Sequence, residues 1–528
     1  MMIKRKNTFK FRSDQNTSKF QDFISMPISL DSIKSHSVFT RAISLSDSTF
    51  NESLIPYDIH LQNSINEYLN IDKIESDFDL ITDKFEESIY EAIEKSKNCM
   101  IPCFNVACDK SIQPNGSFAV IDIGGSTLRV SVVKFLENNK ANCLVNNSWT
   151  IEDGNKHLDR SFFKWIAKNF KSIIHKDLIS ELTNEKGYIK LGITWSFPII
   201  QNESSNRGIV SDLGKGFSIS DEFRGKDLKD IFEDCFQDND IPIEIYAIVN
   251  DSTSVFVTGS YFNNSKLGLV QGTGINSSFL IEPSLLGNEK KKLLPSVMND
   301  GSKLLINSES SFLGYHLNDY ICSADRRMNM IWDLMSYDDI TPPHLTTDAY
   351  GVFQPLEIIT SGRYIPEIIR RIFVGILESD DDVVITESNE YSLTAEFLAG
   401  LSECSDLSKF RNELEELIGV ENIKLEDLNT LKIITETVIY RASIILSSYI
   451  IALVRVTKFT HLENLEISVV GSMLQYFPDY KETVLDILEV ESQDGKLPII
   501  SFDFIKDSSI YGASIAAFVN ESKTMLYN

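Results

Sequence analysis

The segment Phe118-Ala-Val-Ile-Asp-Ile-Gly-Gly-Ser-Thr-Leu-Arg-Val-Ser-Val-Val-Lys-Phe135 is the most informative part of this sequence for its architecture. Its first six residues are apolar apart from one acid and predict a buried strand. Two glycines interrupt this strand, and the last eight residues predict a second one. The pattern indicates a β-hairpin with a glycine-rich tip, where bare backbone N–H groups can approach phosphate oxygens.

A second glycine turn, Gly272-Thr-Gly-Ile-Asn276, follows a predicted strand at 267–271. Strands are also predicted at 191–197 and at 243–249, where the second ends at Asn250-Asp251. Strands that alternate with helices indicate an α/β protein, and two similar glycine turns suggest two comparable halves. The stretches between the strands with helical spacing are 225–236, 357–377, 395–418 and 427–458.

Size and charge exclude some classes of protein. The chain has 528 residues, 42% of them hydrophobic, enough for one large core or two medium ones. Its 50 basic and 76 acidic residues give a net charge of −26, which repels phosphate backbones, so we expect no nucleic-acid partner. The seven cysteines are odd in number and lack zinc-ligand spacing, so we expect free thiols in the reducing cytoplasm. The sequence does not predict an oligomeric state.

Residues 1–55 differ in composition from the rest of the chain. They begin with a basic stretch, are rich in Ser and Asn, and lack the apolar core of a signal peptide. We expect a flexible N-terminal extension, with a mitochondrial presequence as the alternative. The most apolar run, 442–454, contains three serines and ends at Arg455. It is too short to cross a bilayer and predicts a buried helix, so we expect no membrane partner.

Segments that suit phosphate and sugar chemistry occur in a fixed order along the chain. Each is ordinary alone, since most Gly-Gly turns are structural and most glutamates are solvated. Together they resemble the hexokinase family of sugar kinases over residues 75–520. The segments are Asp122-Ile-Gly-Gly-Ser-Thr-Leu-Arg129, Trp195-Ser-Phe-Pro198, Gly214-Lys-Gly-Phe217, Asn250-Asp251, Gly272-Thr-Gly-Ile-Asn276, Glu309, Gln354-Pro-Leu-Glu357 and Gly471.

The resemblance implies an α/β protein with the actin-like ATPase (ribonuclease-H-like) fold, in which two domains close over a cleft. We expect a helical segment of the large domain at 56–115, where Phe85, Ile89 and Ile93 share one face. The predicted small domain spans 116–250 and is joined by 513–528, and the predicted large domain spans 251–512.

The resemblance also implies that Asp251 is the catalytic base. Phosphoryl transfer to an alcohol needs a carboxylate that accepts the hydroxyl proton and aims the oxygen. From the dipeptide Asn250-Asp251 alone, a helix N-cap would be the better interpretation. Lys215 is the second implied catalytic residue, because its point charge suits a phosphate or the accepting hydroxyl.

ATP and Mg²⁺ are the implied cofactors, and Asp122 would hold the Mg²⁺ through water. On the adenosine side the match is weaker, since Val470 stands where the family has an acid. The implied nucleotide-binding residues are Asp122, Gly124, Gly125, Ser126, Thr127, Arg129, Gly272, Thr273, Gly274, Gly471 and Ser472.

A hexose or N-acetylhexosamine is the implied substrate, bound by Ser196, Asn250, Asn276, Glu309 and Glu357. Two departures from the family pattern shrink side chains near these residues: Gly214 replaces a threonine and Ser310 a tryptophan. Extra room suits a bulky 2-substituent, so N-acetylglucosamine is slightly favoured over glucose, mannose and fructose. An ordinary hexokinase and a catalytically weak, sugar-sensing regulator of the same family are the alternatives.

Overall fold

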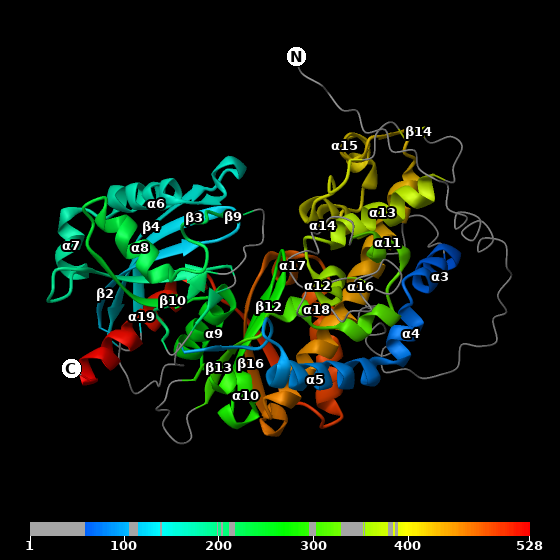
Figure 1. Ribbon diagram of the computed structural model, residues 1–528. Helices are drawn as coiled ribbons and strands as arrows, with labels where there is room; N and C mark the ends of the chain where they lie inside the picture. Colours follow the sequence, from blue (N-terminus) through cyan, green and yellow to red (C-terminus); the bar gives the residue numbers. More distant parts are fainter. Residues whose placement is uncertain are drawn as a thin grey trace, which may run out of the picture.

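The computed structural model describes residues 59–104, 115–137, 140–197, 199–201, 204–210, 217–294, 303–328, 352, 354–378, 384–385 and 389–527. The chain folds around two large β-sheets, each with helices packed against it (Figure 1). This is the α/β class that the sequence predicts. The predicted extension at 1–55 lies outside the described residues.

The first sheet has five strands in the order β10-β6-β2-β3-β4. β2 pairs antiparallel with β3 and parallel with β6, which in turn pairs parallel with β10. The predicted glycine-rich hairpin is therefore at the centre of this sheet. The strands are β2 (Gly116–Ile123), β3 (Thr127–Leu136), β4 (Lys140–Thr150), β6 (Ile189–Trp195) and β10 (Ile243–Val249).

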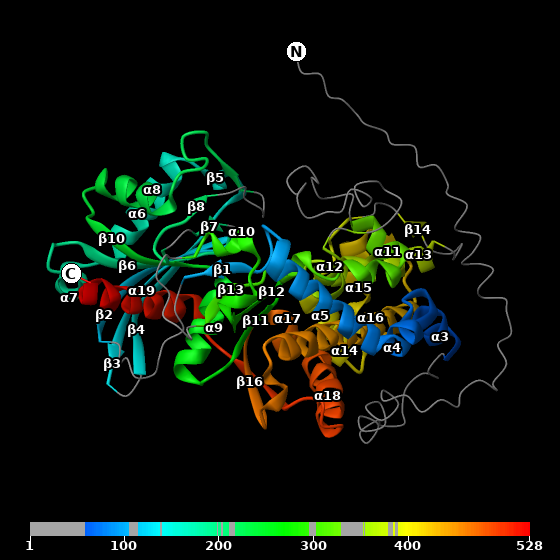
Figure 2. The ribbon, with the colours of Figure 1, turned by 60° about the horizontal axis from the view of Figure 1, so that its bottom comes forward.

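Helices cover both faces of this sheet because side chains of β2 alternate between the two faces. Ala119 and Ile121 pack into a core with α6 (Arg160–Ile173) and α8 (Leu228–Gln237). Phe118 and Val120 pack into another core with α19 (Ser508–Tyr527), which lies along the opposite face (Figure 2). A Cβ at Gly192 of β6 would lie 2.5 Å from the Ala513 carbonyl oxygen. The small residues of α19 therefore serve close packing.

The second sheet has six strands in the order β1-β13-β12-β11-β16-β17. β11, β12, β13 and β1 pair antiparallel, and β11, β16 and β17 pair parallel. The second glycine turn joins β11 to β12, so each sheet carries one such hairpin. The strands are β1 (Ile101–Cys103), β11 (Leu267–Gln271), β12 (Ile275–Ile281), β13 (Leu304–Asn307), β16 (Asn464–Val470) and β17 (Ile499–Phe504).

Helix α16 (Leu425–Val456) runs through the largest core, where it packs against α5 (Phe78–Lys95), α13 (Ile365–Leu377) and α18 (Tyr480–Gln493). By length and composition alone α16 could cross a membrane, but 94% of its most apolar 18-residue window is buried inside the protein. The predicted buried helix at 442–454 is thus confirmed. The predicted helical face of Phe85, Ile89 and Ile93 is also buried in this core.

Two predicted helices are interrupted. The stretch 357–377 breaks between α12 (Pro355–Thr360) and α13, where the N–H of Gly362 donates to the Gly272 carbonyl at 2.8 Å. This contact with the second glycine turn replaces helical bonds. The stretch 395–418 likewise divides into α14 (Ala395–Glu403), η10 (Leu407–Phe410) and α15 (Arg411–Ile418).

The remaining elements are the buried helix α9 and a set of shorter helices and strands. They are α3 (Ile59–Tyr68), α4 (Ile71–Ser76), α7 (Lys176–Leu182), α9 (Asp251–Phe262), α10 (Asn288–Lys291), α11 (Ser323–Arg326), α17 (Ser472–Tyr476), β5 (His157–Leu158), β7 (Ile199–Ile200), β8 (Ile209–Val210), β9 (Ser218–Ile219), β14 (Val384–Ile385), β15 (Val420–Glu421), η3 (Asp153–Asn155), η4 (Pro283–Leu285), η5 (Ser310–Phe312), η6 (Tyr315–Asp319) and η11 (Phe459–His461).

Candidate active site

Helix α9 begins where β10 ends, and its first turn carries the predicted catalytic base. Asn250 is the N-cap, because its Oδ1 accepts hydrogen bonds from the backbone N–H and the hydroxyl of Ser252, both at 3.0 Å. Asp251 is half-buried, and its Oδ1 accepts from the same N–H at 2.8 Å. Asn250 caps the helix, and within the described residues no hydrogen bond holds the second carboxylate oxygen of Asp251, which leaves it free to act as a proton acceptor.

A network of amide side chains joins Asn250 to two other predicted sugar ligands. Asn276 Nδ2 lies 3.5 Å from Asn250 Oδ1 and donates to Asn307 Oδ1 at 2.9 Å. Asn307 Nδ2 donates to Glu309 Oε1 at 2.7 Å. Glu309 itself has a left-handed backbone with φ of 47°, a conformation that costs energy outside glycine and often marks a functional site.

A small, partly open hollow lies beside Asn250. Its lining combines apolar side chains with amide and carboxylate groups, which suits contact with a small polar ligand. Asn250 and Glu309, both predicted sugar ligands, are among the polar lining residues. The lining residues are Ile101, Cys103, Phe197, Ile199, Gln201, Asn250, Asn307 and Glu309.

The first glycine turn follows Asp122, which is buried and held by two partners. Arg129 donates to Asp122 Oδ2 with its NH2 nitrogen at 2.6 Å, and the Ser509 hydroxyl donates to the same oxygen at 2.9 Å. Burial raises the pKa of the Asp122 carboxyl, the Arg129 guanidinium opposes this shift, and the charge of Asp251 adds a smaller raising effect. Asp122 and Asp251 therefore lie close enough to interact.

This arrangement fits a magnesium ion bound with the nucleotide. A divalent cation would offset the cost of burying the Asp122 charge and its repulsion by Asp251. Because Asp122 Oδ2 already accepts from Arg129 and Ser509, a contact through water suits the ion better than direct ligation. The adjoining turn presents half-buried Gly124 and Gly125, exposed Ser126 and half-buried Thr127.

The second glycine turn packs against Gly471 and Glu357. Gly471 has φ of 141°, and a Cβ there would lie 2.1 Å from the Gln271 carbonyl oxygen, so only glycine fits. Glu357 Oε2 accepts from the Ile275 N–H at 3.2 Å. Thr273 and Ser472 are exposed and Gly274 is half-buried. Glu357, a predicted sugar ligand, thus contacts a predicted phosphate-binding turn.

Ser310, which stands where the family pattern has tryptophan, is expected from the sequence to leave extra room beside the sugar. Ser310 is fully buried, and its hydroxyl lies 2.7 Å from the Tyr449 hydroxyl and 2.5 Å from that of Ser308. Ser310 is not among the residues that line the hollow. The Ser310 side chain therefore belongs to a buried hydroxyl cluster and does not contribute to the lining of the hollow.

Part of the predicted site lies outside the described residues, namely Gly214 and Lys215. The next described residue, Phe217, packs on Phe197 with ring centroids 4.6 Å apart. Ser196 is half-buried, and its N–H donates to the Ile123 carbonyl at 3.1 Å, which joins the end of β6 to that of β2.

Sequence reasoning missed Asn307, Ser509 and Tyr449. Asn307 is two residues from Glu309 at a strand end, a spacing that often places side chains on one side and could have signalled the pair. Ser509 and Tyr449 act through contacts between segments far apart in the chain, for which the sequence offers no local signal.

Two family models, both described as hexokinase, match this chain over residues 65–261 and 266–519. N-acetylglucosamine kinase 1 of Candida albicans is 29% identical over 442 residues, which cover 80% of this chain and 86% of that protein. The hexokinase of Kluyveromyces lactis is 25% identical over 428 residues, or 77% of this chain and 81% of that one.

Among solved structures, the hexokinase from Schistosoma mansoni complexed with glucose matches with a TM-score of 0.69 at 20% identity. The match covers 88% of this chain and 100% of that chain. At this identity the likeness shows the fold, and with the two family models it confirms the predicted actin-like ATPase fold.

Proposed function

This chain belongs to the hexokinase family of sugar kinases, and we propose that it transfers the γ-phosphoryl group of ATP to the 6-hydroxyl of a hexose, with N-acetylglucosamine as the preferred substrate. The observation that carries the proposal is the first turn of α9. There Asn250 caps the helix and leaves the Asp251 carboxylate available, beside a hollow lined by Asn307 and Glu309.

In the proposed reaction Asp251 takes the proton of the 6-hydroxyl. The sugar oxygen forms a bond to the γ-phosphorus as the bond between that phosphorus and the ADP oxygen breaks. Asp122 would hold Mg²⁺, which neutralises phosphate charge when bound. The turns at Gly124 and Gly272 would present N–H groups to the phosphates, and Lys215 keeps its predicted role beside the transferred group.

The preference for N-acetylglucosamine is supported by the relative from Candida albicans, which is named for that sugar and aligns with most of this chain. Ser310 gives no support, since its side chain lies in a buried cluster. The relatives named hexokinase make glucose the natural comparison substrate. We also propose a cytoplasmic location, because the six described cysteines are all free thiols.

The test is the position of the phosphate on the product. The purified chain is incubated with ATP–Mg²⁺ and N-acetylglucosamine, and the product is examined by ³¹P and ¹³C NMR. We expect a 6-phosphate, and the 6-deoxy sugar should bind without being phosphorylated. A phosphate at the anomeric oxygen, or turnover of the 6-deoxy sugar, would show that the proposed chemistry is wrong.

A further inference from the structure

Asn307 lies at a junction of the candidate site. It ends β13 where that strand pairs with both neighbours, opposite Ile101 of β1 and Ser278 of β12. Its side chain is buried, since only 5% of the residue is exposed. Two flanking strands therefore fix the backbone of Asn307, and the amide is held in one place.

The Asn307 amide bonds to groups on three different elements. Its Oδ1 accepts from the Ser252 hydroxyl of α9 at 3.0 Å and from Asn276 Nδ2 of β12 at 2.9 Å. Its Nδ2 donates to Glu309 Oε1 at 2.7 Å, at the start of η5. The Ser252 hydroxyl also lies 3.0 Å from Asn250 Oδ1, so its single proton is shared between the two amide oxygens. The one amide thus connects the surroundings of three predicted sugar ligands.

The chemistry of the partners fixes which way this amide points. The Ser277 backbone N–H donates at 2.8 Å to Asn276 Oδ1, so Asn276 must turn Nδ2 toward Asn307. The Asn307 atom that receives this bond must be its oxygen, and its nitrogen therefore faces Glu309. A side chain that offers a donor on one side and an acceptor on the other is required here.

We propose that Asn307 is a positioning residue that holds Glu309 in its sugar-binding orientation and couples it to Asn250 and Asn276. The inference rests on the proposed function, since Glu309 is a sugar ligand only if the chain binds sugar. Glu309 has a left-handed backbone at the edge of the hollow, and the 2.7 Å bond from Asn307 aims its carboxylate. A charge-assisted hydrogen bond of this kind gives both direction and strength.

The sharpest probe is Asn307→Asp, which keeps the shape and replaces the donor that faces Glu309 by an acceptor. Two carboxylates at this distance cannot both ionise without strong repulsion, so the pair keeps one proton to a higher pH than a lone carboxyl. At low pH the shared proton restores the hydrogen bond. At high pH it is lost, and Glu309 is pushed from its position.

At about pH 8 the KM of the variant for the sugar should exceed that of wild type about tenfold to a hundredfold, because a hydrogen bond to a charged group is exchanged for a like-charge contact. At about pH 5.5 the KM should exceed that of wild type only about threefold. The kcat at saturating sugar should change little at either pH, because Glu309 binds the ground state and the transition state alike. A merely structural defect would not produce a loss that low pH reverses.

Three buried groups close to Asn307 and Glu309 keep one protonation state over this pH range, whereas the Lys290 ammonium, whose pKa burial lowers to about 8, titrates in wild type and variant alike. Burial raises the pKa of the Cys99 thiol to about 12 and that of Cys103 to about 11, and the pKa of the nearby Tyr449 hydroxyl to about 12. None of them titrates in the tested range. Asp251 on α9 is present in both proteins.

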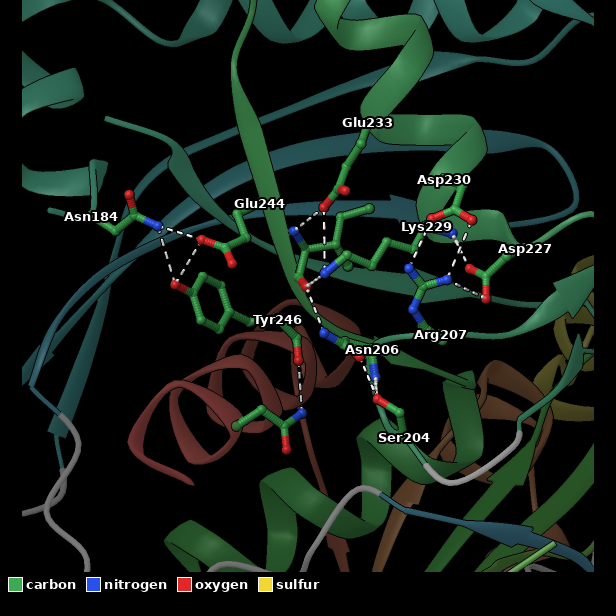
Figure 3. Close-up of polar contacts among 12 residues, drawn as sticks. Asn184, Ser204, Asn206, Arg207, Asp227, Lys229, Asp230, Glu233, Glu244 and Tyr246 are labelled. Carbon is green, nitrogen blue, oxygen red and sulfur yellow. Dashed lines mark hydrogen bonds and ion pairs between the residues drawn. The ribbon is translucent and has the colours of Figure 1, made fainter. Parts of the chain in front are cut away.

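The matched control is Asn184→Asp. Asn184 Nδ2 also donates to a carboxylate, Glu244 Oε2 at 2.5 Å, and lies 3.2 Å from the Tyr246 hydroxyl, in a polar cluster of the five-stranded sheet and α8 (Figure 3). The substitution makes the same like-charge contact outside the candidate site, so KM should match wild type at every pH. Asn307→Ser removes the bond without adding charge and should raise KM equally at both pH values.

A second measurement separates this inference from the proposed function. In the Asn307→Asp variant without sugar, the carboxylate pair has a higher pKa in the folded than in the unfolded protein. The proton that the pair holds therefore stabilises the fold at low pH, and this stabilisation is lost as the pH rises through the folded pKa. The melting-temperature deficit of the variant should therefore grow between about pH 5 and about pH 8. A constant deficit overturns the inference whether or not the chain is a kinase.

The KM values decide whether Asn307 positions Glu309 for sugar binding. If wild type phosphorylates sugar and the Asn307→Asp to wild-type KM ratio does not change with pH, Asn307 does not position Glu309. If wild type neither binds nor phosphorylates any sugar, the proposed function fails, and the role of Asn307 in substrate binding fails with it. A pH-dependent KM ratio in Asn307→Asp together with a flat one in Asn184→Asp supports the inference.

Discussion

Asp251→Asn isolates the proposed proton acceptor from the other contacts of this residue. The amide oxygen of the new side chain can still accept the Ser252 N–H that Asp251 Oδ1 accepts at 2.8 Å. Asn250 continues to cap α9 through its own 3.0 Å bond. The stability cost is limited to the favourable charge at the helix N-terminus, about 0.3–1 kcal/mol, and is partly offset by relief of the repulsion on Asp122.

The cost to catalysis is much larger. Loss of a general base typically lowers the rate about 10²- to 10⁴-fold. At about 1.36 kcal/mol per tenfold, this is about 2.7–5.4 kcal/mol of barrier. The expected barrier increase therefore exceeds the stability cost several-fold. Initial rates of sugar-dependent ADP release at saturating ATP–Mg²⁺ give kcat, and sugar titration followed by tryptophan fluorescence gives the affinity, which should be largely retained.

Asp159→Asn is the matched control for this experiment. Asp159 caps α6 through Oδ1, which accepts from the Phe162 N–H at 2.9 Å, and asparagine is an equally good cap. The same chemical change at another helix N-terminus should leave kcat unaltered. A kcat for Asp251→Asn within about threefold of wild type would refute the assignment, given the scale of general-base effects.

Three further substitutions test the glycine turns, the hydroxyl cluster and the core. In Gly471→Ala the new Cβ would lie 2.1 Å from the Gln271 oxygen, so the KM for ATP should rise about tenfold or more, the scale of about 1–3 kcal/mol of backbone strain. The control is Gly495→Ala, where φ is 74° and a Cβ meets nothing within 4 Å. This control should not raise the KM for ATP. Ser310→Trp overfills a buried site and should lower stability by about 1–3 kcal/mol or more, with the kcat/KM ratio of N-acetylglucosamine to glucose unchanged; selective loss of N-acetylglucosamine would show that Ser310 does gate the pocket. Arg441→Met removes the two 2.8 Å bonds that Arg441 makes to the fully buried Asp325 carboxylate, and should lower the free energy of unfolding in urea by about 3–5 kcal/mol. In the double variant with Asp325→Asn this loss should be smaller.

The parts of the fold that the sequence predicts well are those with strong local patterns. The hairpin of β2 and β3 and the strands β6, β10 and β11 have continuous apolar runs that end in Gly, Pro or Asn-Asp signals. Strand β4 is missed because it is an edge strand in which exposed polar residues leave only weak alternation. The break after α12 is missed because its cause, the Gly362 bond to Gly272, joins segments far apart in the sequence.

In the candidate site, too, residues with a local sequence signal could be predicted, and residues that depend on distant segments could not. Asn250 and Asp251 could be located because a strand end and a helix start meet there. Glu309 could be located only by resemblance to a motif, and for its partner Asn307 the two-residue spacing at a strand end was the one local signal. The contact of Ser310 with Tyr449 could not be predicted, because Tyr449 lies 139 positions away on α16.

The proposed sugar kinase activity is tested by sugar-dependent release of ADP by the purified 528-residue chain with ATP–Mg²⁺, measured for N-acetylglucosamine, glucosamine, glucose, mannose and fructose under identical conditions. We expect turnover, with the highest kcat/KM for N-acetylglucosamine. A highest value for glucose would keep the sugar kinase and contradict the proposed preference. No turnover on any of the five sugars would contradict the central claim and favour a sugar-sensing regulator.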